Sequence, residues 1–114
     1  MGTPAAKVLE LVVFKLHEGV GREEFLATND AVTEWASQRP GFISREQAYD
    51  ADGDRWIDII WWKSLDDAQA ASTAAMTSPS CAPMFALIDD AATLMIHGHA
   101  IRAAVQGDAA PAGA

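Results

Sequence analysis

The sequence predicts an α+β domain with the element order β-α-β-β-α-β. Three observations support this prediction: an apolar, strand-like run near the N-terminus, an Asp-Gly turn between two strand-like runs in the middle, and a helix-like segment after the first and the third run. A chain of 114 residues can bury one modest core. We therefore expect one domain over residues 1–105, followed by a disordered tail rich in Ala and Gly at residues 106–114.

The first strand is predicted over residues 8–16, where β-branched and other apolar residues follow one another almost without interruption. Gly19 and Gly21 break this run. Residues 22–39 then place apolar side chains at helical spacing, which predicts an amphipathic helix lying against the sheet. Pro40 and Gly41 cannot continue that helix, so we expect it to end before them.

The middle of the chain predicts a β-hairpin and a second helix. Strands over residues 42–49 and 55–63 flank a loop that contains Asp52-Gly53, a pair typical of turns that need a positive φ. Ser64 is an expected N-cap, and the helix that follows it should run to about Met76. A short helical turn is expected over residues 84–90 and a last strand over residues 93–104.

Composition narrows the function classes. The net charge is −8 and the eight basic residues are scattered, which argues against a nucleic-acid partner. No apolar run approaches the roughly 20 residues of a membrane span. The first residues do not resemble a secretory signal, so we expect a cytoplasmic protein. Cys81 is the single cysteine and has no basic neighbour, which favours a buried or inert thiol over a nucleophile.

The element order is that of a ferredoxin-like domain, in which two helices cover one face of an antiparallel sheet. The other face of these strands is too apolar to be left in water. Four segments carry a resemblance to a known family: Pro40-Gly41-Phe42, Asp52-Gly53, Trp62-Lys63-Ser64 and Ala68. With these segments the chain resembles the dimeric α+β barrel superfamily, and within it the antibiotic-biosynthesis-monooxygenase-like proteins.

This resemblance implies a homodimer in which two sheets pair to form a barrel, with a small-molecule ligand bound in a cavity. It also implies a cofactor-independent monooxygenase acting on an aromatic or polyketide-like substrate, and therefore no cofactor. Haem-degrading relatives use an Asn on the first strand, which this chain lacks, so haem degradation is not expected. Two other functions stay open: a noncatalytic binding or stress-response barrel, and a polyketide cyclase-type enzyme.

Strand alternation predicts which residues line the cavity. One face is expected to carry the following residues: Glu10, Val12 and Phe14; Arg45 and Gln47; Trp56, Asp58, Ile60 and Trp62; and Met95, His97, His99 and Ile101. Asp58 is the first catalytic candidate, because a carboxylate in an apolar strand must be paired or have its pKa raised. It would act as a general base or accept a hydrogen bond from a phenol or enol. The alternative, given equal weight, is a structural ion pair with Arg45.

His97 and His99 are the other catalytic candidates, since two histidines on one strand face lie about 7 Å apart and can contact one ligand. They would donate to a developing oxyanion. The alternative is that they are solvated or satisfied structural residues. They do not predict a metal site, because the sequence fixes no third ligand. Substrate binding is assigned to Trp56 and Trp62 by stacking, and to Arg45, Glu10 and Phe14. Core packing is the alternative role for the tryptophans.

Overall fold

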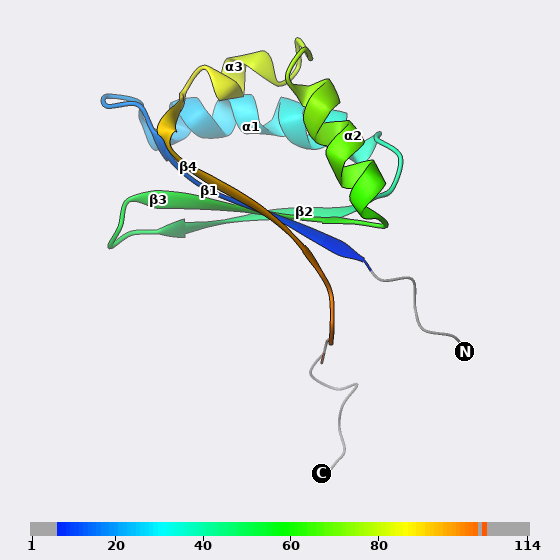
Figure 1. Ribbon diagram of the computed structural model, residues 1–114. Helices are drawn as coiled ribbons and strands as arrows, with labels where there is room; N and C mark the ends of the chain where they lie inside the picture. The colour runs from blue at the N-terminus through cyan, green and yellow to red at the C-terminus, as the bar shows by residue number, and fades with distance from the viewer. Residues whose placement is uncertain (1–6, 103, 105–114) are drawn as a thin grey trace, which may run out of the picture.

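The computed structural model describes residues 7–102 and 104, and it confirms the predicted α+β class. A four-stranded antiparallel sheet has the strand order β2-β3-β1-β4. All three helices lie over one face of this sheet, and the other face is left uncovered by the described residues (Figure 1). The elements are β1 (Val8–Leu16), α1 (Arg22–Ser37), β2 (Phe42–Asp50), β3 (Arg55–Trp62), α2 (Leu65–Ala75), α3 (Ala82–Phe85) and β4 (Ile88–His99).

The register places the predicted residues in rows across the sheet. Glu10 lies opposite Ile60 on one side and opposite His97 on the other, and Arg45 lies opposite Ile60. Residues directly opposite each other in an antiparallel pair share a face of the sheet. These four residues therefore form one row on the face that the helices cover, as alternation predicted.

The core lies between this face and the helices, in two clusters. One cluster joins Phe14 and Trp56 of the sheet to Phe25 of α1, and includes Cys81, which is fully buried as predicted. The other cluster packs Ile60 and Trp62 against α2. Ala68 and Ala71 form the contact surface of α2, and their small side chains let this helix approach the sheet closely.

The uncovered face is apolar. Leu94 and Ile96 of β4 are 56% and 47% exposed, and their register partners on β1 are Val13 and Leu11. Isoleucines and a tryptophan of β3 continue this surface, at Ile57, Ile59 and Trp61. A contiguous exposed apolar surface of this kind is typical of interaction sites.

Two boundary features shape the chain around β2 and β3. Gly41 has a φ of +81°, a conformation that suits glycine, and its carbonyl accepts a hydrogen bond from the Lys63 backbone at 2.8 Å. The hairpin loop forms where it was predicted, but the positive φ belongs to Asp54 (52°) and not to Gly53. Asp tolerates this conformation, and the Tyr49 hydroxyl donates to its carboxylate at 2.7 Å.

The boundaries predicted after α2 were wrong. The short helix is α3 at Ala82–Phe85, and β4 begins at Ile88 and ends at His99. Asp89 and Asp90 have low strand propensity, but pairing with the end of β1 places them in the strand, next to a register shift between Val13 and Lys15.

Other boundaries are closer to prediction. The helix α1 ends at Ser37, before Arg39, and Ser64 caps α2 by accepting from the Asp67 backbone at 3.0 Å, as predicted. The tail predicted at residues 106–114 lies outside the described residues. In the described part of the chain, no helix is both long and apolar enough to span a membrane.

Candidate functional site

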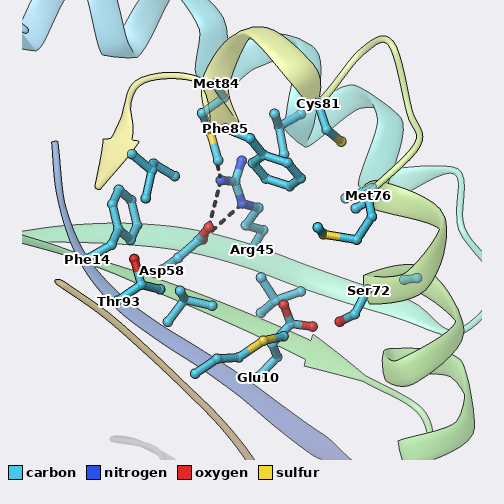
Figure 2. A pocket seen from close by; sticks show the side chains of 18 of the residues that line it. Glu10, Phe14, Arg45, Asp58, Ser72, Met76, Cys81, Met84, Phe85 and Thr93 are labelled. Carbon is cyan, nitrogen blue, oxygen red and sulfur yellow. Dashed lines mark hydrogen bonds and ion pairs between the residues drawn. The ribbon is translucent and has the colours of Figure 1, made fainter. Parts of the chain in front are cut away.

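A cavity of about 310 Å³ lies between the helix-covered face of the sheet and the helices. Its volume is at the lower end of the usual range for small-molecule sites. Figure 2 shows its side chains converging from the sheet below and from the helices above. The lining residues are Glu10, Val12, Phe14, Val32, Trp35, Ala36, Arg45, Asp58, Ile60, Trp62, Ala71, Ser72, Ala75, Met76, Cys81, Met84, Phe85, Ile88, Asp90, Thr93 and Met95.

Five of the eight predicted site residues line this cavity: Glu10, Phe14, Arg45, Asp58 and Trp62. The other three share the same face of the sheet but are not among its lining residues.

Trp56 instead packs on Phe25 and Tyr49, with ring centroids 4.7 and 5.0 Å apart, and lines a smaller pocket at the hairpin end of the sheet. His99 is exposed opposite Val8, at the far end of β4. His97 does not line the cavity, but its Nε2 lies 3.6 Å from Oε1 of the lining residue Glu10.

Asp58 and Arg45 form a buried, bidentate ion pair, which is the pair that the sequence analysis gave as the alternative for Asp58. The guanidinium donates through Nε to Oδ1 at 2.9 Å and through Nη2 to Oδ2 at 2.8 Å. The two side chains are only 2% and 7% exposed. Arg45 also donates to the Thr33 hydroxyl at 2.6 Å. Both carboxylate oxygens of Asp58 are thus engaged, which weakens its case as a proton acceptor.

Glu10 is the second buried carboxylate of the cavity, and its environment differs from that of Asp58. The indole of Trp62 donates to Oε1 at 3.0 Å, and His97 Nε2 lies 3.6 Å from the same oxygen. Burial raises the pKa of Glu10 above its ordinary value of 4.5, although the nearby His97 and the Trp62 hydrogen bond act in the opposite direction. No arginine or lysine contacts this carboxylate among the described residues.

Ser72 of α2 adds a hydroxyl beside Glu10. Its Oγ is buried and has no hydrogen-bond partner in the described part of the chain. Figure 2 shows the Ser72 hydroxyl and the Glu10 carboxylate pointing toward the same end of the cavity. A buried polar group without a partner is rare, and here it leaves a donor and acceptor available to a ligand.

Apolar and sulfur-containing side chains form the rest of the wall. Met76, Met84 and Met95 line the cavity together with Cys81, whose thiol pKa is raised by burial. Thioether side chains adapt their shape and make favourable contacts with aromatic rings. The cavity therefore suits an apolar, ring-containing molecule that offers a hydrogen-bond donor to Glu10.

The sequence reasoning missed Ser72, Met76 and Met84 as lining residues, whereas strand alternation placed Met95 on the correct face. A signal for Ser72 was present, because it follows the buried Ala68 by four residues, one turn along the same helix. No local pattern marks Met76 or Met84, since their place in the wall depends on how α2 and α3 pack.

The cavity is rich in carboxylates and poor in free cations. Glu10, Asp58 and Asp90 line it, and the one cationic side chain among the described lining residues, Arg45, is bound to Asp58. Within residues 7–102, no three histidine, cysteine or acidic side chains come together as metal ligands would. The arrangement can therefore accept a proton or a hydrogen bond from an uncharged ligand, whereas a ligand carboxylate would be repelled.

Comparison with known proteins identifies relatives in structure only. No protein-family model matches the sequence, and no curated protein is significantly similar to it. Solved structures do match. SnoaB from Streptomyces nogalater, a cofactor-independent oxygenase, superposes with a TM-score of 0.63 at 18% identity, covering 90% of this chain and 99% of SnoaB.

A candidate antibiotic biosynthesis monooxygenase from Bordetella bronchiseptica has a TM-score of 0.68 at 11% identity, over 85% of this chain and 99% of the other. A dimeric protein of unknown function from Bacteroides fragilis, with a ferredoxin-like fold, has a TM-score of 0.55 at 17% identity. The match covers 82% of this chain and 95% of that protein. The chain therefore has the ferredoxin-like fold of the antibiotic-biosynthesis-monooxygenase-like proteins, as its sequence motifs predicted.

Proposed function

We propose that this protein is a homodimeric barrel that binds a small aromatic or polyketide-like molecule and oxidises it with dioxygen, without a cofactor. The observation that carries the proposal is the cavity of about 310 Å³, whose apolar wall surrounds the buried Glu10 carboxylate. The similarity in fold to the cofactor-independent oxygenase SnoaB supports it.

The proposed dimer covers the apolar face of the sheet. Leu94 and Ile96 are half exposed in one chain, and β1 and β3 continue the same surface. A second copy offers an identical apolar face, so packing the two sheets together removes both from water. The fold similarity to a dimeric protein from Bacteroides fragilis supports this arrangement.

The proposed chemistry needs little from the protein besides binding and proton transfer. The substrate has a methylene group that is conjugated through an aromatic ring system with a carbonyl group. This methylene loses a proton to give a carbanion. The carbanion transfers electrons to dioxygen, and the hydroperoxide that forms loses water to leave a ketone. The overall change converts CH2 and O2 into C=O and H2O. The apolar cavity favours this reaction by excluding water.

The site residues take the following roles in this proposal. Phe14 and Trp62 contact the ring system of the substrate, and Arg45 and Asp58 form a fixed polar wall. Trp56 and His99 lie away from the cavity and receive no role.

The test is oxygen consumption with anthrone, a compound that has such a methylene. We expect uptake above the spontaneous rate, with anthraquinone as the product. Ser72→Phe places a ring in the cavity and should abolish the uptake, whereas Ser37→Phe on the exposed end of α1 should not. Absence of protein-dependent uptake, or full activity in Ser72→Phe, would contradict the proposal.

The fully satisfied Arg45–Asp58 pair favours a second candidate function, a noncatalytic binding barrel. Buried ion pairs of this kind often serve structure alone. This candidate predicts that anthrone raises the melting temperature of the protein while neither oxygen consumption nor a new product is detected.

A further inference from the structure

We infer that Glu10 is the group that takes the substrate proton in this cavity, and that His97 passes this proton on to solvent. The inference depends on the proposed function for the class of substrate, a carbon acid with a conjugated carbonyl. It does not depend on whether dioxygen reacts afterwards.

Of the three carboxylates in the cavity wall, Glu10 is the one best placed to accept a proton from a ligand. Asp58 has both oxygens bound by the Arg45 guanidinium, and Asp90 is exposed to water. The contacts to Glu10 from Trp62 and His97 both go to Oε1. Oε2 has no hydrogen bond to any residue that the structure describes, so it can receive a proton from a ligand.

The groups packed around Glu10 favour this role. His97 faces it from β4 and Trp62 from β3, and the Ser72 hydroxyl lies at the same end of the cavity on α2. The Asp58 carboxylate lies in the same wall, and its charge disfavours a negative charge on Glu10. Burial and Asp58 together raise the pKa of Glu10, and a carboxylate with a raised pKa is a stronger base than one in water.

His97 supplies the route by which the proton leaves. Its Nε2 lies 3.6 Å from Glu10 Oε1 and has no hydrogen-bond partner in the described chain. The Nε2 atom is itself buried, but the His97 side chain as a whole is 21% exposed, compared with 11% for Glu10, so the rest of the ring connects Glu10 with solvent. Histidine is suited to this transfer because it gains and loses protons near neutral pH.

The proton-transfer step balances as follows. The C–H bond of the methylene breaks, and its electron pair moves into the ring system and onto the carbonyl oxygen of the substrate. The proton forms an O–H bond with Glu10. It then passes to the Nε2 lone pair of His97, and the resulting imidazolium releases its Nδ1 proton to water. Proton exchange with water then restores the starting tautomer of His97, Glu10 is again a carboxylate, and nothing is oxidised.

Deuterium exchange under anaerobic conditions tests this step without the oxidation. Anthrone is incubated with the protein in D2O, and the loss of its methylene protons is followed by NMR. We expect exchange faster than the buffer rate with the unaltered protein. Glu10→Gln should lower the protein-dependent rate by about 100-fold or more, the usual contribution of a general base. Glu24→Gln, an exposed matched change on α1, should leave the rate unchanged.

The role of His97 is tested by the rate at which the proton captured by Glu10 exchanges with solvent. In the absence of His97 the proton captured by Glu10 returns to the substrate before it exchanges with D2O, so the exchange rate falls. We expect His97→Ala to slow exchange at least tenfold and added imidazole to restore part of the rate. A purely structural histidine would not respond to imidazole. His17→Gln, a change at an exposed histidine of the loop after β1, serves as the control.

The outcomes separate the two proposals. Exchange that requires Glu10, without any oxygen uptake in air, would support this inference and overturn the oxygenase proposal. Oxygen uptake that persists in Glu10→Gln would support the oxygenase proposal and overturn this inference. Equal exchange in the unaltered protein and Glu10→Gln, or no exchange above buffer with a folded protein, would overturn the inference. A His97→Ala variant that exchanges normally would overturn the role of His97.

Discussion

Removal of the Asp58 carboxylate should destabilise the protein far more than removal of an exposed partner in a similar pair. Asp58→Ala deletes both acceptors of the Arg45 guanidinium and leaves the cation with the Thr33 hydroxyl and the Met84 sulfur as side-chain partners. The Arg45 side chain is only 2% exposed, so water solvates its charge poorly once the carboxylate is lost. Breaking a buried pair in this way costs about 3–5 kcal/mol.

This loss is large for a domain of this size, whose total stability is expected to be about 5–15 kcal/mol. For a domain of about 100 residues it corresponds to a fall in melting temperature of roughly 12 °C or more. Urea unfolding followed by circular dichroism measures it directly. The double variant Arg45→Met, Asp58→Leu removes both charges, and we expect it to recover most of the stability that Asp58→Ala loses.

The chain provides a matched control in its second Arg–Asp pair. Arg55 donates to Asp50 at 2.7 Å, but these side chains are 53% and 28% exposed. Asp50→Ala should therefore cost a small fraction of what Asp58→Ala costs, because water replaces the lost contact. Equal losses in the two variants would refute the reasoning, since burial would then not govern the strength of the pair.

Three further predictions concern Glu10, the uncovered face and Gly41. An acid whose pKa is raised by folding binds its proton more tightly in the folded state, so its contribution to stability falls as the pH rises from 4.5 through the folded pKa. Glu10→Gln should therefore be more stable than the unaltered protein at neutral pH, and this difference should vanish below pH 4.5, as urea titrations will show. Ile96→Lys places a charge on the apolar face and should convert a dimer to a monomer in light scattering. Gly41→Ala forces a left-handed φ on alanine and drives its Cβ into the Asp67 side chain, so it should cost at least about 1–2 kcal/mol of unfolding free energy.

Each of these variants has a control. Leu26→Lys also charges an exposed apolar residue, but on α1, and it should leave the oligomeric state unchanged. Gly19→Ala imposes a similar φ of +90° where a Cβ meets no atom within 4 Å, so it isolates the backbone strain from the steric clash. A monomeric Leu26→Lys, or equal losses at the two glycines, would contradict the corresponding argument.

The fold could be predicted from the sequence because local and long-range signals agree along most of the chain. Residues 8–16 and 55–62 are strands by composition and alternation alone, and Ser64 marks the start of α2. The start of β4 could not be predicted, because Asp89 and Asp90 join the strand through their pairing with β1 and against their own propensity.

The site could be predicted only as a face of the sheet. Alternation places Glu10, Asp58 and Trp62 on one side, which the structure confirms. Alternation allowed an ion pair between Arg45 and Asp58 to be proposed, but it cannot show that the guanidinium binds both oxygens of Asp58, or that α2 brings Ser72 beside Glu10. These contacts depend on side-chain conformation and on helix packing, and they shift the role of proton acceptor from Asp58 to Glu10 in our proposal.

The central claim is that the cavity beside Glu10 holds a small aromatic molecule. A crystal structure of the protein with anthrone, grown without oxygen, tests it most directly. Our account predicts planar density between Phe14 and Met84, with the methylene edge of the ring system facing Glu10. A cavity closed by movement of Met76 or Met95, or a ligand bound elsewhere, would contradict it.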